Sequence, residues 1–311
     1  MGHTTEGKLP VDQEKNEIYY RFFGTGDETL VCLHGGPGQG QSYLKILEEL
    51  RVPNLRLLFY DQMGSGKSDA GKNVKWGVRR FVEELEAIRK GLKLKRIHIF
   101  GHSWGGMLAM QYAIDYGRNV KSLILSNTSA KMTEIMAEIW RLQASLPAKH
   151  YRTMIKAMSG KEVPAKDLED ARLEFNARYL RRETPFEIRK SKERFKELFP
   201  ATREAYGPSF QGLWGEDPFN CGCVPCNGPL LEWDASGQIR NILAPTLILC
   251  GMHDEITPEL HAKLASEIPD NQFVVFGNSS HFMTHEKEVD LYLAVMERFL
   301  TRMVNGSRHD A

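Results

Sequence analysis

The sequence predicts an α/β fold in which a mostly parallel sheet is covered by helices on both faces. Short apolar or β-branched runs typical of strands recur along the chain, and amphipathic helical periods separate several of them. Such alternation favours parallel pairing, because each crossover helix packs back onto the sheet. The predicted strands are residues 18–24, 28–33, 55–60, 96–100, 120–126, 245–250 and 271–276.

The predicted helices follow the same alternation, with one long interruption. They cover residues 75–92, 104–117, 258–267 and 285–303. Between residues 130 and 238 the sequence instead shows helical patterns, such as TEIMAEIWRLQASL, and no convincing strand. We therefore expect an α/β core formed by residues 1–129 and 239–311, with residues 130–238 inserted as a helical cap subdomain.

Composition excludes several classes of protein. Of the 311 residues, 41% are hydrophobic and 26% charged, proportions typical of a globular chain. The formal net charge of +1 provides no global field to attract nucleic acid or an anionic membrane. Apolar runs fall far short of the roughly 20 residues of a membrane helix, and the start lacks the apolar stretch of a secretory signal. We expect a cytoplasmic protein that binds neither nucleic acid nor membrane; the sequence leaves its oligomeric state open.

The five cysteines are too few and too unevenly placed for a disulfide framework. Three of them form CGCVPC at 221–226, and closely spaced thiolates suit zinc or disulfide exchange. No second CxxC or HxxxH completes four ligands. We therefore favour a Gly/Pro-rich loop with incidental thiols over a metal or redox site, and we predict no bound metal.

The segment IFGHSWGG at 99–106 places Ser103 in a GxSxG pentad between a predicted strand and a predicted helix. This context indicates a nucleophile on a tight turn, although a plain strand-to-helix turn is the alternative. A serine hydroxyl needs a base to accept its proton and a third group to orient that base. Asp254 and His281 follow the last two predicted strands, in the order expected of an α/β-hydrolase sheet, and they complete the predicted triad. His253 is the rival base, but adjacent residues at a strand end usually point apart.

An oxyanion also needs hydrogen-bond donors. The backbone N–H of Trp104, directly after the nucleophile, is expected to supply one. The HGGPG loop at 34–38 follows an earlier strand and offers Gly36, whose missing side chain lets its N–H face the developing charge. The alternative interpretation of this loop is an ordinary Gly/Pro turn.

The segment DQMGSGKS at 61–68 ends like a phosphate-binding loop. Asp61, however, stands where the first glycine of that motif is required, and the helix-breaking DAGKNVK follows in place of a helix. We therefore favour a turn beside the HGGPG loop over nucleotide binding.

Together, HGGPG, FYDQMGSGKSD at 59–69, GHSWGG, GMHDEITP and SSHF resemble the prolyl iminopeptidase branch of the α/β-hydrolases, which includes the tricorn-interacting aminopeptidases. The resemblance covers nearly the whole chain and is weakest in the helical insert. It implies an enzyme without a cofactor that releases an N-terminal residue, often proline, from short peptides or amino acid amides. It also implies that the insert is a cap over the active site.

The resemblance further implies how a substrate is held. The family binds the free amino terminus with glutamates, one directly after the triad aspartate, and Glu255 occupies that place. Such a carboxylate pairs with an ammonium group and so fixes how many residues precede the scissile bond. The alternative is that Glu255 is an ordinary solvated charge at the end of a strand. The second family glutamate precedes a phenylalanine in the cap, whereas this chain reads GPSF at 207–210. Glu216 is our candidate to replace it, with Glu204 and Glu232 as alternatives, and we also expect Gly35 to contact the substrate.

We therefore expect a serine hydrolase of the aminopeptidase type, acting on small peptides or on amino acid amides or esters. A carboxylesterase, lactonase or broad amidase with the same triad is the alternative. A hydrolase-fold binding protein is less favoured, because nucleophile, acid, base and HGGPG loop are all present. A dehalogenase or epoxide hydrolase with an aspartate nucleophile is disfavoured, because the turn holds Ser103.

Overall fold

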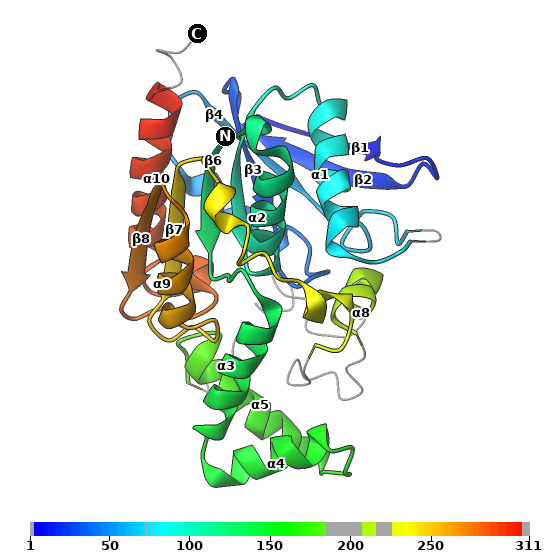
Figure 1. Cartoon of the computed structure of the whole chain (residues 1–311), viewed down its shortest axis with the longest axis vertical. Helices are drawn as coiled ribbons and strands as arrows, with labels where there is room; N and C mark the ends of the chain where they lie inside the picture. The colour runs from blue at the N-terminus through cyan, green and yellow to red at the C-terminus, as the bar shows by residue number, and fades with distance from the viewer. Residues whose placement is uncertain (1–2, 72–73, 185–206, 216–225, 307–311) are drawn as a thin grey trace.

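The computed structural model describes residues 3–71, 74–184, 207–215 and 226–306. Its strands form one eight-stranded sheet in the order β1-β2-β4-β3-β5-β6-β7-β8 (Figure 1). The strands are β1 (Thr4–Pro10), β2 (Glu17–Phe23), β3 (Glu28–Leu33), β4 (Leu55–Tyr60), β5 (Ile97–His102), β6 (Val120–Ser126), β7 (Thr246–Gly251) and β8 (Asn271–Phe276).

Strands β3 to β8 are mutually parallel, and β1 and β2 complete the sheet as antiparallel strands at one side. The predicted mostly parallel sheet and its seven strands are therefore confirmed. Strand β1 is the one strand of the described sheet that the sequence did not predict. Its sequence, TTEGKLP, is polar and mostly exposed on both faces, so it lacks the apolar alternation that identifies a half-buried strand. Because the other strands run in one direction, their carboxyl ends meet at a single edge of the sheet.

Helices cover both faces of the sheet, as predicted. The α-helices are α1 (Val78–Gly91), α2 (Trp104–Tyr116), α3 (Met132–Ala144), α4 (Ala148–Met158), α5 (Ala165–Tyr179), α8 (Pro208–Trp214), α9 (Pro258–Glu267) and α10 (Val289–Gly306). Shorter 3₁₀ helices are η1 (Ser42–Glu49), η2 (Gly117–Asn119), η3 (Pro229–Glu232), η4 (Ile239–Asn241) and η5 (Met283–His285).

Alternating side chains of the strands divide the apolar core into two layers. On β3, Val31 and Leu33 pack in the layer covered by α1, α2 and α9, whereas Leu30 and Cys32 pack in the layer covered by η1 and α10. This period of two is what a strand buried on both faces requires. The double burial fixes the register of the strands, and with it the positions of the loops at the carboxyl edge.

The described residues between 130 and 238 contribute helices α3, α4, α5 and α8 together with η3. The entry to this segment and its exit lie side by side. The N–H of Ala235 donates to the carbonyl of Ala130 (2.8 Å), and Lys131 Nζ lies 2.7 Å from Asp234 Oδ2. A segment that leaves and rejoins the core at one point has the geometry of an insertion, and Figure 1 shows α3, α4 and α5 extending from the carboxyl edge of the sheet.

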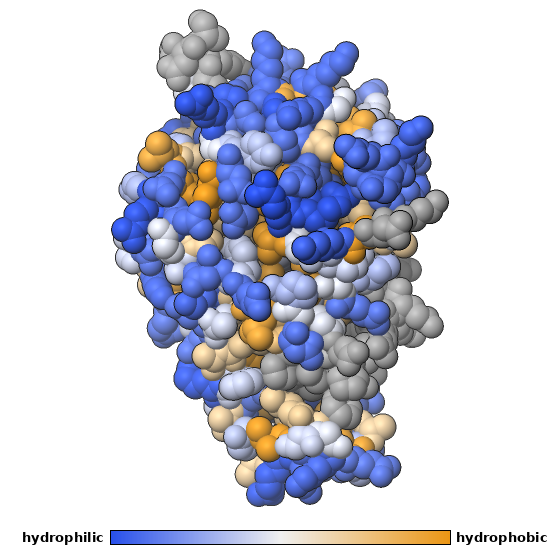
Figure 2. Space-filling model, turned by 45° about the vertical axis from the view of Figure 1, so that its right-hand side comes forward, coloured by the Kyte–Doolittle hydropathy of each residue, from blue (hydrophilic) through white to orange (hydrophobic). Residues whose placement is uncertain are grey.

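The surface is mainly hydrophilic on the face seen in Figure 2. Large hydrophobic side chains that stay exposed come from separate elements, which is ordinary for a globular chain. They are Trp140, Ile155, Leu243, Met252 and Leu291. Among the described residues, no helix combines the length and the apolar character needed to cross a membrane.

Candidate active site

Ser103 stands on a sharp turn between β5, a central strand, and the first residue of α2. Its backbone is strained, with φ +56° and ψ −122°. The flanking glycines explain how the turn closes. A Cβ on Gly101 would lie 2.3 Å from the carbonyl oxygen of Gly105, and one on Gly105 would lie 2.2 Å from that of Leu33. The GxSxG pattern is therefore required by the close approach of β5, α2 and β3.

Asp254 and His281 form a buried acid–base pair at the carboxyl ends of β7 and β8. His281 Nδ1 lies 2.8 Å from Asp254 Oδ1, and His281, not His253, makes this contact. Because a carboxylate only accepts, Nδ1 carries the proton of the neutral imidazole, and in that form Nε2 is left to act as a base. Burial alone would lower the pKa of His281, but the Asp254 carboxylate raises it to about 9, with help from Glu255.

The loop that carries His281 is held against the residue before the nucleophile. His102 Nε2 donates to the carbonyl of His281 (2.9 Å), and Tyr43 Oη bridges His102 Nδ1 (2.8 Å) and the N–H of Gly35 (2.7 Å). Burial lowers the pKa of His102 to about 3, so this ring is neutral. Among the described residues, no hydrogen bond joins the Ser103 hydroxyl to the His281 imidazole, and their pairing stays a prediction. Catalytic contacts often tighten only when substrate binds.

The HGGPG loop lies directly beside the nucleophile. A Cβ on Gly35 would stand 3.1 Å from the Cβ of Ser103. Gly36 has φ +113°, and a Cβ there would stand 2.8 Å from the backbone nitrogen of Gly38, so only glycine fits. Trp104 is the first residue of α2, where a backbone N–H has no acceptor within the helix. Both predicted oxyanion donors thus come from segments next to Ser103.

Glu255 lies beside the acid–base pair, with Oε1 4.0 Å from His281 Nε2 and its side chain 19% exposed. Burial raises its pKa to about 7, although the neighbouring His281 acts in the opposite direction. The end of α5 closes on the same place, because the carbonyl of Tyr179 accepts from the backbone N–H groups of both Glu255 (3.2 Å) and His281 (3.3 Å). Glu255 is thus a largely buried carboxylate where the end of α5 meets the loops that follow β7 and β8.

The second predicted carboxylate is not located. In GPSF, Ser209 is buried and its hydroxyl donates to the carbonyl of Gly64 (3.2 Å). Glu232 is exposed at the end of η3. Glu204 and the candidate Glu216 lie outside the described residues.

The remaining sequence motifs have ordinary surroundings. Within the described ranges no cluster of His, Cys, Asp and Glu suits a metal ion. Cys226 is a buried free thiol whose pKa burial raises to about 11, and Cys221 and Cys223 lie outside the described residues. In the phosphate-loop-like segment, the Asp61 carboxylate accepts from the backbone N–H groups of Gln41 and Lys67 (both 2.9 Å). The turn also contacts the HGGPG loop, because Gln62 Nε2 donates to the carbonyl of His34 (2.9 Å), so it lies beside that loop as predicted.

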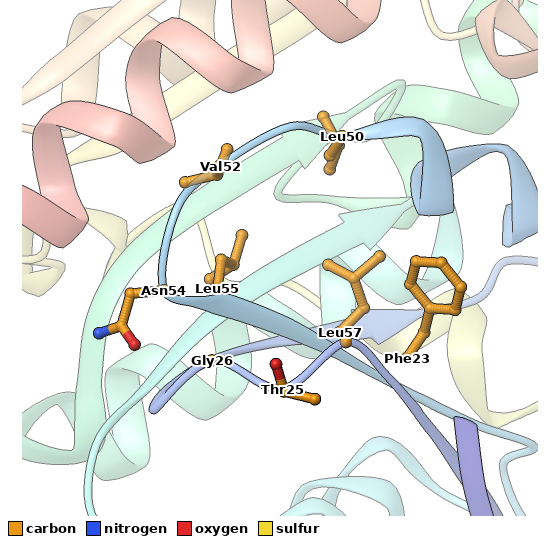
Figure 3. Close-up of a pocket in the computed structure, with 9 residues that line it drawn as sticks. Phe23, Thr25, Gly26, Leu50, Val52, Asn54, Leu55 and Leu57 are labelled. Atoms are coloured by element: carbon orange, nitrogen blue, oxygen red, sulfur yellow. The ribbon is translucent and has the colours of Figure 1, made fainter. Parts of the chain in front are cut away.

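A hollow of about 500 Å³ lies at the opposite edge of the sheet (Figure 3). It is formed by the turn from β2 to β3 and by the segment that leads into β4, with Thr25, Asn54 and Leu57 among its lining residues. These segments precede β3 and β4, whereas the predicted triad residues follow strands. The described lining includes no titratable side chain, so this hollow lacks the groups that acid–base chemistry needs.

Sequence reasoning missed the buried polar groups around the pair, above all Asn127. Its amide donates to Asp254 Oδ2 at 2.7 Å. Nothing in the local sequence marks Asn127 as part of the site, because its partner is 127 positions away along the chain. The signal that was available is its place directly after the predicted strand 120–126, as Ser103 and Asp254 also follow predicted strands.

Comparisons with known proteins agree with the fold described above. A family model described as the alpha/beta hydrolase fold matches residues 28–288. A proline iminopeptidase of Clostridium botulinum is 32% identical over 307 residues, covering 96% of this chain and 98% of that protein. One of Saccharolobus solfataricus is 32% identical, with coverage of 92% and 89%. The crystal structure of the Mycobacterium smegmatis proline iminopeptidase superposes with a TM-score of 0.81 at 25% identity, covering 97% of this chain and all of that one.

Sequence similarity over almost the full length, the family model and the shared fold lead to one conclusion. The chain is an α/β-hydrolase and belongs to the proline iminopeptidase family.

Proposed function

We propose that this chain is a serine aminopeptidase that releases the N-terminal residue of short peptides or amino acid amides through an acyl-enzyme on Ser103. The 2.8 Å contact between His281 Nδ1 and Asp254 Oδ1 carries the proposal, because it leaves His281 Nε2 as a base at the edge where Ser103 stands. The names of the relatives, proline iminopeptidase, support hydrolysis of the aminopeptidase type.

In the proposed reaction, His281 Nε2 takes the proton of the Ser103 hydroxyl while Oγ attacks the substrate carbonyl. The N–H groups of Gly36 and Trp104 bind the oxyanion. The imidazolium, stabilised by Asp254, then protonates the leaving amine as the C–N bond breaks. Water attacks the resulting ester, His281 again accepts and returns a proton, and the free amino acid leaves.

Glu255 is proposed to select substrates with a free amino terminus. Its carboxylate stands 4.0 Å from His281 Nε2 and its side chain is 19% exposed, so it can pair with an ammonium group next to the scissile bond. A carboxylate or a blocked amino group on the substrate cannot form this ion pair with Glu255. Residues 130–238 are proposed to act as a cap, since the end of α5 bonds to the backbone of both Glu255 and His281.

Partners and location follow from the same chemistry. We propose a small peptide, amino acid amide or ester as the substrate, with no nucleic acid or membrane as partner. A cytoplasmic location is supported by the free thiols of Cys32, Cys226 and Cys250, since cysteines stay reduced in that compartment.

The test compares aminoacyl arylamides with free and acylated amino groups. Hydrolysis of proline or alanine arylamides should be lost in Ser103→Ala by roughly 10⁶-fold in kcat, with an unchanged thermal unfolding temperature. Acylating the amino group should abolish turnover by the wild-type enzyme. Equal rates on free and blocked substrates would contradict the aminopeptidase assignment and point to a broad amidase or esterase. Unchanged activity of Ser103→Ala would contradict the mechanism.

A further inference from the structure

The turn after β6 connects all three residues of the proposed triad. We propose that Asn127 in this turn is a positioning residue, whose amide holds the Asp254 carboxylate in the orientation that directs His281 toward Ser103. The inference rests on the proposed function, because it gives Asn127 a part in activating that serine.

The backbone of the turn is tied to the nucleophile and to β7. Ser103 donates its N–H to the carbonyl of Ser126 (2.9 Å), and the hydroxyl of Thr128 donates to the carbonyl of Ser103 (2.9 Å). Asn127 donates its own N–H to the carbonyl of Leu249 (2.9 Å). It is fully buried with φ +54°, a left-handed conformation that asparagine tolerates better than most residues other than glycine.

Each hydrogen-bonding group of the Asn127 amide has a partner. Nδ2 donates to Asp254 Oδ2 (2.7 Å) and to the carbonyl of Ser280 (3.1 Å), and Oδ1 accepts from Ser126 Oγ (2.5 Å). The two partners of Nδ2 are acceptors only, so the amide has a single satisfactory orientation. Because Ser280 precedes His281, this one amide joins the acid to the backbone of the base.

The Asp254 carboxylate depends on Asn127 at its second oxygen. Oδ1 accepts from His281 Nδ1 (2.8 Å) and from the N–H of Ile256 (2.9 Å), whereas Oδ2 accepts from Asn127. Without this donor, a buried anionic oxygen loses its partner, which is costly inside a protein. Less stabilised by hydrogen bonds, the carboxylate then orients the imidazole less firmly and holds its proton more tightly, so His281 Nε2 accepts the Ser103 proton less readily.

The charges around the pair give the direction of the pH effect. Burial tends to raise the pKa of Asp254, but His281 and the donation by Asn127 hold it below its usual value. Without the Asn127 donor, the Asp254 carboxylate holds the imidazolium proton of His281 more strongly, so the pKa of His281 rises. As the pH is lowered, activity should therefore be lost at a higher pH than in the wild-type chain. The substitution leaves in place the other described titratable groups that interact with this pair: His102, Cys250, Glu255, His261 and Glu286.

The test uses Asn127→Gly, which keeps the left-handed backbone and deletes the amide. Its matched control is Asn54→Gly at the opposite edge of the sheet, where Asn54 has φ +64° and accepts a hydrogen bond from the N–H of Asp27 (3.0 Å). Asn127→Gly should lower kcat on proline arylamide by about 10- to 100-fold with KM nearly unchanged, as when other groups that orient active-site residues are removed. It should move the acidic limb of kcat/KM to higher pH and slow fluorophosphonate labelling of Ser103 by a similar factor. Asn54→Gly should change none of these.

The outcomes separate this inference from the proposed function. Wild-type kcat, labelling rate and pH profile in folded Asn127→Gly would overturn the inference alone. A wild-type chain that neither hydrolyses aminoacyl arylamides nor reacts at Ser103 would overturn both. If thermal unfolding shows that Asn127→Gly does not fold, Asn127→Asp takes its place, since it keeps the size of the side chain but turns an oxygen toward Asp254. Its kcat at neutral pH should fall at least about tenfold, and a wild-type value would overturn the inference.

Discussion

Two glutamates at opposite edges of the sheet have opposite electrostatic surroundings. Glu28 begins β3 at the amino edge, where the His98 imidazole, with Nε2 3.4 Å from Glu28 Oε2, and Lys121, with Nζ 2.6 Å from Glu28 Oε1, lower its pKa to about 2. Glu255 follows β7 at the carboxyl edge, where burial raises its pKa to about 7. The first carboxylate is locked in an ion pair at neutral pH, whereas the second can exchange protons and ligands there.

The hollow of Figure 3 extends this contrast between the edges. The amino edge holds a cavity of about 500 Å³ whose described lining has no titratable group. The carboxyl edge instead gathers an acid, an imidazole and a strained serine from three different strands. In this molecule the convergence of groups with shifted pKa values marks the site better than the size of a hollow does.

The largest expected effect comes from neutralising the acid of the carboxyl edge. Asp254→Asn should lower kcat by roughly 10⁴-fold, because the imidazole loses the carboxylate that fixes its tautomer and stabilises its charge. Since Asp254 raises the pKa of His281, the residual activity should also persist to lower pH. Steady-state kinetics between pH 5 and pH 10 measure both. A loss of less than about tenfold would remove the basis for assigning chemistry to this edge.

Glu255→Gln should have the next largest effect, and it should depend on the substrate. On an arylamide with a free amino group, KM should rise by about 10- to 100-fold, since a charge-assisted contact worth about 1.5–3 kcal/mol is lost. On an ester without an amino group, KM should change little. The acidic limb of kcat/KM on that ester should shift to lower pH, because the Glu255 charge raises the pKa of His281. An equal rise in KM on both substrates would contradict a role in recognising the amino terminus.

Glu84 of α1 sharpens the comparison, because it is a buried carboxyl group with no part in the proposed mechanism. It lies near the carboxyl edge, where it accepts from the N–H of Met63 after β4. Burial raises its pKa from 4.5 to about 8. The folded chain therefore holds a proton that the unfolded chain releases, so the stability that this group contributes below pH 4.5 is lost as pH rises through 8. Glu84→Gln should remove this decline in the free energy of unfolding, measured by urea titration at several pH values, and leave kcat within about twofold. A decline that persists in the variant would contradict the assignment to Glu84.

The smallest effect is expected at the hollow of the amino edge. Thr25→Trp adds bulk to a residue that lines it, far from the carboxyl ends of the strands. Turnover of arylamides should stay within about twofold of wild type, as for most surface substitutions. A marked loss of kcat/KM with normal thermal unfolding would show that the two edges are coupled and would weaken the contrast.

Much of the fold and the core of the candidate site could be predicted from the sequence, for physical reasons that differ along the chain. A doubly buried strand such as β7 is a nearly continuous apolar run, and the GxSxG turn has few alternatives once a strand precedes it and a helix follows. The edge strand β1 is exposed and polar, so its pattern carries no signal. It forms because its backbone pairs with β2, a tertiary interaction that periodicity does not encode.

The site residues that escaped prediction are those whose role depends on distant partners. Asn127 looks like any turn residue until Asp254 is placed beside it, and Tyr43 becomes relevant only because it bridges Gly35 and His102. The cap carboxylate is a different case. The family resemblance predicts a glutamate directly before Phe210, but Ser209 stands there and its hydroxyl donates to a buried carbonyl. Whether another glutamate replaces it depends on the path of residues 130–238, which local sequence does not determine.

Active-site labelling tests the central assignment most directly. A labelled fluorophosphonate should modify the wild-type chain at one position, Ser103, identified by peptide mapping. The labelling rate should rise with pH as His281 loses its proton, and His281→Ala should abolish it. An unlabelled Ser103 in a preparation that still hydrolyses proline arylamide, or a rate independent of His281, would contradict the account.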